Sequence, residues 1–142
     1  EDQLVRFLQL ARQLSMEPLV EVNNEAEMEC ALRVGARVIG INNRNLHDFT
    51  VDMDTTTRLI GERASQLHDV IFAALSGISE RSDVEYFQRA GARAILVGEA
   101  LMRAPDPKAK IKVTLVWNFF LLNSKLLTDS SYRNCKDRNI HW

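Results

Sequence analysis

The sequence predicts the α/β fold class, with parallel strands alternating with helices. Two observations support this prediction. Short apolar segments rich in β-branched residues alternate along the chain with longer amphipathic segments. One unit of helix, glycine and strand also occurs twice, because residues 28–41 (MECALRVGARVIGI) align with residues 84–97 (VEYFQRAGARAILV) at a constant offset of 56. Strands that alternate with helices in this way are joined by right-handed crossovers and lie parallel.

Four strands and the helices between them follow from these segments. The runs after the two repeated glycines, residues 38–41 and 94–97, are too continuously apolar for an exposed edge, and they fit parallel strands that are covered on both faces. The expected strands are residues 18–22, 37–42, 70–75 and 93–97. A first helix is expected over residues 2–15 and a third over residues 54–66. The order is therefore α-β-α-β-α-β-α-β-α.

Local signals predict where the helices begin and end. Asn24 is followed three residues later by Glu27, which is the pattern of a capping box at the start of the second helix. Asp54 is expected to cap the third helix, and Ser79 stands where the fourth should begin. Each copy of the repeat has a glycine after the helix, where the left-handed conformation ends a helix at little cost.

The alternation alone leaves two architectures open, a doubly wound open sheet and a (β/α)8 barrel. Four βα units in about 110 residues are half of a barrel that typically takes about 250 residues. A dinucleotide-binding open sheet is expected to carry G-x-G-x-x-G after a strand, and the sequence lacks this motif. The pattern of elements does not decide between the two.

Composition and charge argue against several classes of function. The formal net charge of −1 gives no basic field for nucleic acid. Cys30 and Cys135 fit no metal or redox spacing, which suits a reducing compartment. The chain opens without the pattern of a secretory signal. Its longest apolar stretch, residues 113–122, has about half the length of a membrane span. We expect a cytoplasmic protein without nucleic-acid, membrane or metal partners.

Polar residues follow the first two expected strands, at the edge where ligands meet parallel sheets. Glu21 lies between two valines of a short apolar strand, where an unpaired carboxylate is costly to bury. It is expected to point into the mouth of the fold and to pair with a ligand or a cation, for which Arg44 is the candidate. Asn42 and Asn43 end the second strand, although asparagine is also a common turn residue.

The last two expected strands each lead into a helix through a glycine. Ser76 and Gly77 follow the third strand, and Gly98 and Glu99 follow the fourth. Free backbone N–H groups and the positive end of a helix favour an anion at such a turn. In barrels, the loops after strands seven and eight are a frequent phosphate site. Ordinary turn and cap chemistry remains the alternative for each of these positions.

Four segments, in this order, resemble the C-terminal half of indole-3-glycerol phosphate synthase: MEPLVEVNNEAEME, GARVIGINNRNLHDFTVD, ALSGIS and GARAILVGEALMRAPDP. The resemblance extends from about residue 4 to residue 111. It implies a (β/α)8 TIM barrel rather than an open sheet, with strands five to eight of that barrel in this chain. We therefore expect a half-barrel of four βα units over residues 1–111 and a divergent, irregular C-terminal tail over residues 112–142.

The resemblance also implies a reaction. The family is a carboxy-lyase of tryptophan biosynthesis that closes an indole ring on 1-(2-carboxyphenylamino)-1-deoxyribulose 5-phosphate, with loss of carbon dioxide and water. Glu21 matches a catalytic carboxylate that acts in proton transfer. Asn42, also taken as catalytic, and Arg44 match the pair at the anthranilate end of the substrate. Ser76 matches a substrate-binding serine, although the family often has glutamate where this chain has Leu75.

The phosphate of the substrate is expected, by the same resemblance, at a second group of residues. Gly77, Gly98 and Glu99 match the phosphate-binding positions of the family and would act mainly through backbone N–H groups. Neither a metal nor an organic cofactor is implied. The expected partners are a small phosphorylated substrate, and an N-terminal half-barrel or a fused tryptophan-pathway domain. The open strand edges of a half-barrel also predict self-association.

The chain departs from the family in one respect that concerns catalysis. The family also uses a glutamate and a lysine on its first strand and a general-acid lysine on its third. The expected strands here match only the last four, and no lysine precedes Lys108. The isolated chain is therefore expected to be inactive. The alternative function is a non-catalytic half-barrel that binds phosphorylated ligands.

Overall fold

A computed structural model describes residues 1–61 and 63–114 and contains one parallel sheet. The strands lie in the order of the sequence, and each pairs in parallel with the next. They are β1 (Leu19–Val22), β2 (Val38–Asn42), β3 (Ile71–Leu75) and β4 (Ala94–Leu96). The predicted α/β class with four parallel strands is confirmed.

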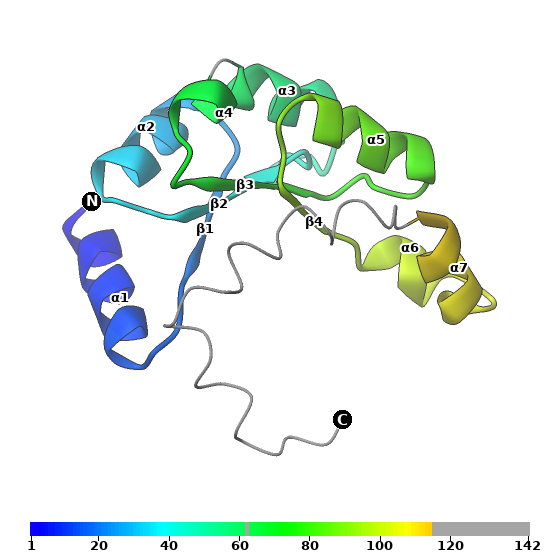
Figure 1. The fold of residues 1–142 in the computed structure, drawn as a ribbon, viewed down its shortest axis with the longest axis horizontal. Helices are drawn as coiled ribbons and strands as arrows, with labels where there is room; N and C mark the ends of the chain where they lie inside the picture. The colour runs from blue at the N-terminus through cyan, green and yellow to red at the C-terminus, as the bar shows by residue number, and fades with distance from the viewer. Residues whose placement is uncertain (62, 115–142) are drawn as a thin grey trace.

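The helices form the outer layer of an arc whose inner layer is the sheet (Figure 1). They are α1 (Asp2–Gln13), α2 (Glu25–Arg33), α3 (Asp54–Ile60), α4 (Arg63–Gln66), α5 (Arg81–Arg89), α6 (Glu99–Met102) and α7 (Pro107–Thr114). Helices α2 to α5 follow the middle of the arc, while α1 lies beside its first end and α6 and α7 beside its last (Figure 1). The curvature is that of part of a TIM barrel.

The hydrophobic core lies between the sheet and the helices. The residues of β1, β2 and β3 that face the helices are almost fully buried, and they pack against buried residues of α2, α3 and α5 such as Met28, Leu59 and Phe87. Period-two alternation places the intervening strand residues on the inner face of the arc. On this face, a Cβ at Gly40 would lie 2.6 Å from Leu19 Cδ2 and 2.7 Å from Leu75 Cδ1. Glycine at this position therefore lets two leucines of neighbouring strands meet over β2.

Burial on both faces was expected for the two strands of the repeated unit, and it is found in β2 but not in β4. In β2 and β3, four of the five residues are buried, whereas β1 alternates between exposed and buried residues and β4 has no buried residue. Leu19 is 46% exposed and Leu96 is 62% exposed. These two leucines lie on the outermost strands of the sheet, which have a neighbouring strand on one side only.

The glycines of the repeated unit behave as expected. Gly35 follows α2 with a φ of 75°, and Gly91 follows α5 with a φ of 100°. The alanine after each glycine, Ala36 or Ala92, is 3% exposed. Each copy of the repeat therefore ends its helix in the left-handed region and leads directly into the core.

The third helix is shorter than the pattern predicted, because the expected single helix over residues 54–66 divides in two. Helix α3 ends at Ile60, and Gly61 has a φ of 46°, outside the helical region. The expected cap is also displaced. Asp54 is the first helical residue, and its N–H donates to the carboxylate of Asp52 at 3.0 Å.

The cap of α2 was predicted at the correct residue, Asn24, whereas the start of α5 was predicted two residues too early. Asn24 Oδ1 accepts from the N–H of Glu27 at 3.0 Å, as a capping box requires, but the Glu27 carboxylate accepts from the N–H of Asn23. Helix α5 begins at Arg81 rather than at Ser79. Asp83 of its first turn accepts from the N–H of Ser79 at 2.9 Å, so Ser79 is a partner of the cap. The predicted tail begins within α7, and residues 115–142 lie outside the described residues.

The exposed edges of this arc predict self-association of the chain. Strands β1 and β4 are outermost in the sheet of the described residues. Phe7 and Leu10 of α1 and Leu14, which follows it, are 67%, 53% and 62% exposed. We expect dimers or larger species at micromolar concentration in size-exclusion chromatography with light scattering. Leu10→Lys should shift the distribution toward monomer, whereas the same charge at exposed Gln9 should not. A monodisperse wild-type monomer would contradict this expectation.

Candidate functional site

The candidate site is the edge of the sheet at which all four strands end. Because the strands are parallel and paired in order, their C-terminal ends fall at the same edge. Strand β1 contributes Glu21, β2 contributes Asn42, and the turns after β3 and β4 contribute Ser76 and Gly98. We call this edge, with the residues that follow each strand, the rim.

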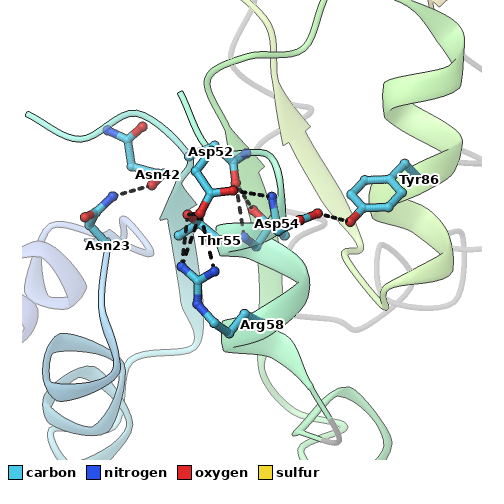
Figure 2. A network of polar contacts seen from close by, with 9 residues as sticks. Asn23, Asn42, Asp52, Asp54, Thr55, Arg58 and Tyr86 are labelled. Carbon is cyan, nitrogen blue, oxygen red and sulfur yellow. Dashed lines mark hydrogen bonds and ion pairs between the residues drawn. The ribbon is translucent and has the colours of Figure 1, made fainter. Parts of the chain in front are cut away.

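Glu21 and Asn42 are in direct contact on the inner face of the sheet. Asn42 Nδ2 donates to Glu21 Oε1 at 2.7 Å. The asparagine is 6% exposed and is held on its other side, because its Oδ1 accepts from the N–H of Arg44 at 2.9 Å. Its carbonyl accepts from Asn23 Nδ2 at 2.6 Å (Figure 2). A fixed amide thus orients an exposed carboxylate, which can accept or donate a proton at this position.

Arg44 does not pair with Glu21, so that expectation was wrong. Its Nη2 donates to Glu99 Oε2 at 2.9 Å, and its Nη1 reaches the carbonyl of Phe49 at 3.4 Å. Arg44 lies beyond the end of β2 and forms an isolated antiparallel bridge with Val51. The loop that follows β2 therefore sets its position, and the carboxylate within its reach is the one at the start of α6.

The turn after β3 has two consecutive residues in the left-handed region. Ser76 has a φ of 65° and Gly77 a φ of 80°. The serine conformation is uncommon for a residue with a side chain, and such strain often occurs at functional sites. A Cβ at Gly77 would lie 2.5 Å from Met53 Sδ and 2.8 Å from Val51 Cγ1. The glycine is thus required by the close approach of the loop after β2, whatever it also binds.

The turn after β4 differs, because its glycine is not crowded. A Cβ at Gly98 would meet nothing within 4 Å, and its φ lies outside the left-handed region. Glu99 is the first residue of α6, and its side chain is 58% exposed. Its two oxygens pair with different arginines, since Oε2 accepts from Arg44 and Oε1 from Arg103 Nε at 3.1 Å.

Asn43 is a buried structural residue that joins the ends of β2 and β3 to α3, a role that was not predicted. It is 1% exposed and makes four side-chain hydrogen bonds. Its Nδ2 donates to the carbonyls of Leu75 and Ser76 at 3.0 and 3.2 Å. Its Oδ1 accepts from the N–H and hydroxyl of Thr56 at 3.1 and 2.8 Å. The strict alternation of strand side chains was the available signal, since it sends Asn43 to the face opposite Asn42.

A second polar network fixes the loop after β2 to the helices (Figure 2). Asp52 accepts from the N–H of Asp54, the hydroxyl of Thr55 and the guanidinium of Arg58. These donors hold the pKa of Asp52 below its ordinary value, the N–H of Asp54 contributing most. Asp54 in turn accepts from Tyr86 Oη of α5 at 2.5 Å. These contacts position the base of the loop that carries Arg44.

Neither a metal cluster nor a membrane span is found where the structure can be described. In residues 1–61 and 63–114, no three His, Cys, Asp or Glu side chains come together as a metal site requires. No helix in the same residues has the length and apolarity to cross a membrane.

The fold and the rim together define a class of protein. Four parallel strands alternate with helices on the outside of an arc (Figure 1). Polar side chains gather where the strands end. This is the arrangement of a partial TIM barrel, whose ligand-binding edge is the C-terminal one.

The chain belongs to the indole-3-glycerol phosphate synthase family, whose model matches residues 1–114. It is 54% identical over 118 residues to a multifunctional tryptophan biosynthesis protein of Phanerodontia chrysosporium and 53% identical over 108 residues to that of Schizosaccharomyces pombe. These alignments cover 81% and 76% of this chain but only 14% of each relative. The indole-3-glycerol phosphate synthase of Leuconostoc mesenteroides is 45% identical, with 79% of this chain and 42% of that protein covered.

A solved structure supports the fold independently of close sequence similarity. The Amycolatopsis orientalis BexX/CysO complex includes a chain that superposes with a TM-score of 0.58 at 18% identity. The superposition covers 97% of this chain and 53% of the other. At this identity, the likeness concerns the fold alone.

Replacing Asn43 should destabilise the fold rather than affect ligand binding alone. Asn43→Ala leaves the Ser76 carbonyl and the N–H and hydroxyl of Thr56 without the amide, whereas the Leu75 carbonyl keeps the backbone N–H of residue 43. We therefore expect the free energy of unfolding to fall by about 2–3 kcal/mol. Urea denaturation followed by circular dichroism measures the change. Asn45→Ala, which removes one hydrogen bond to the exposed His47 N–H, is the matched control and should cost less than about 1 kcal/mol. Equal losses of unfolding free energy in Asn43→Ala and Asn45→Ala would contradict the structural role of Asn43.

Proposed function

We propose that this chain supplies the strand-five to strand-eight half of an indole-3-glycerol phosphate synthase active site. The reaction closes the indole ring of 1-(2-carboxyphenylamino)-1-deoxyribulose 5-phosphate with loss of carbon dioxide and water. The observation that carries the proposal is the 2.7 Å hydrogen bond between Asn42 and Glu21 at the rim. It presents an oriented carboxylate at the ligand-binding edge of a chain that belongs to this family.

Glu21 and Asn42 are the proposed catalytic residues. Ring closure, dehydration and aromatisation all require protons to move, and a carboxylate held by a fixed amide can transfer them. The Glu21 side chain is exposed, so it is accessible to a substrate on the inner face of the sheet. Asn42 is buried and held on both sides, so it keeps the carboxylate in one orientation.

Arg44 and Ser76 are the proposed substrate-binding residues, with Arg44 at the anthranilate end. The guanidinium of Arg44 is 31% exposed and can bind a carboxylate through charge-assisted hydrogen bonds. Such an interaction would hold the aryl ring in place until its carboxylate leaves as carbon dioxide. Ser76 lies in a strained turn directly after β3, and β3 lies between β2 and β4 in the sheet.

The phosphate is proposed to lie against the last two turns, at Gly77, Gly98 and Glu99. Support comes from their place after the final two strands, where barrels commonly bind phosphate. The open space around Gly98 would let a phosphate approach its backbone. Because Glu99 is acidic, it would contribute through its backbone N–H and not through its side chain.

The rest of the active site is proposed to come from a partner half-barrel. The chain spans less than half of the Leuconostoc mesenteroides relative and about one seventh of the two fungal ones. The lysines that the family uses on its first and third strands have no counterpart before Lys108. The partner is an N-terminal half-barrel, and the multifunctional relatives make a fused tryptophan-pathway domain a further candidate. Without such a partner, the alternative is a phosphate-binding half-barrel that does not catalyse.

The activity should require both halves. We expect no indoleglycerol phosphate, measured by fluorescence, from the 142-residue chain alone. Co-expression with the part of the Leuconostoc mesenteroides synthase that precedes the aligned region should restore turnover, because it supplies the missing lysines. Glu21→Gln should then reduce turnover at least a hundredfold. Glu85→Gln removes a surface carboxylate of α5 and should leave turnover unchanged. Turnover by the isolated chain would contradict the proposal. So would undiminished turnover by the Glu21→Gln variant when it is co-expressed with the N-terminal part.

A further inference from the structure

The ion pair between Arg44 and Glu99 joins two ends of the rim. Arg44 follows β2 and Glu99 follows β4, so their contact passes over the end of β3. The distance from Arg44 Nη2 to Glu99 Oε2 is 2.9 Å. Glu99 also pairs with Arg103, which follows the same helix α6, because Oε1 lies 3.1 Å from Arg103 Nε. One carboxylate is therefore shared between the proposed substrate-binding arginine and an arginine further from the rim.

We propose that Glu99 is a positioning residue that occupies Arg44 in the empty site and yields it to the carboxylate of the substrate. The inference rests on the proposed function, since it needs Arg44 to bind the anthranilate carboxylate. A guanidinium binds a carboxylate best with two parallel N–H donors. Here Nη2 is already used by Glu99, while Nη1 has only a 3.4 Å contact to the Phe49 carbonyl.

A ligand carboxylate can replace Glu99 at Arg44 because Glu99 still has Arg103 as a counter-charge. A ligand carboxylate at Arg44 would stand beside the Glu99 carboxylate, and like charges at that distance repel. When the ligand displaces Glu99, the glutamate keeps its pair with Arg103 and is not left without a counter-charge. Glu99 thus competes with the ligand for Arg44, and Arg103 competes with Arg44 for Glu99.

The competition should be weak enough for a substrate to overcome. The side chains of Arg44 and Glu99 are 31% and 58% exposed, so solvent screens their attraction. Partly exposed pairs of this kind change equilibria by about two- to fivefold. The pair would hold the arginine at the rim before binding and would release it at little cost.

Labelling of Arg44 with phenylglyoxal, followed by peptide mass spectrometry, tests the contact in the full chain. Glu99→Gln should raise the labelling rate of Arg44 about two- to fivefold, because the guanidinium loses its charged partner. Arg103→Gln should lower the rate, because Glu99 is then left to Arg44 alone. An unchanged rate in Glu99→Gln, or an equal rise in both variants as expected from general loosening of α6, would overturn the inference.

Protection by 2-aminobenzoate separates this inference from the proposed function. The ligand should protect Arg44 in wild type, and the half-protecting concentration should fall about two- to fivefold in Glu99→Gln. Equal half-protecting concentrations would overturn the role of Glu99 and would leave Arg44 as the anion-binding residue. Absence of protection in both proteins would overturn the substrate-binding role of Arg44 in the proposed function, and the inference with it.

Discussion

The alternation of side chains at the end of β2 is the constraint on which the rest of the rim depends. Asn42 and Asn43 are adjacent in sequence and lie on opposite faces of the sheet. Asn42 turns to the inner face and holds Glu21, whereas Asn43 turns toward the helices and holds Leu75, Ser76 and Thr56. The same two residues thus orient the candidate carboxylate and anchor the structure beneath it. A shift of one residue in the register of β2 would exchange these roles.

The loop after β2 extends this arrangement across the sheet. Its base is fixed to α3 and α5 through Asp52 and Asp54 (Figure 2). Val51 and Met53 fill the space beside Gly77. This packing lets Arg44 reach Glu99 beyond the end of β3. Two separate polar pairs result, Glu21 with Asn42 and Arg44 with Glu99. The first suits proton transfer, and the second holds Arg44, the proposed anion-binding residue, at the rim.

The sequence was sufficient to predict the framework, since the expected strands match β1 to β4 within one residue at each end. Apolar runs and the repeated glycine are local signals, and they report burial and helix ends directly. The partners of charged groups were not predictable in the same way. Arg44 was expected at Glu21 because the two strands are neighbours, but its position depends on the path of a loop. The break at Gly61 was also missed, because the residues on both sides of it have helical propensity.

The central claim is that Asn42 orients the Glu21 carboxylate for the reaction. The most direct test is the kcat/KM of the Asn42→Ala variant, co-expressed with the N-terminal half-barrel, with urea denaturation measured on the same protein. If Asn42 holds the catalytic carboxylate, kcat/KM should fall at least about tenfold in protein that the urea transition shows to be folded under the assay conditions. Wild-type kcat/KM in Asn42→Ala would show that the hydrogen bond to Glu21 has no part in the reaction and would contradict the account.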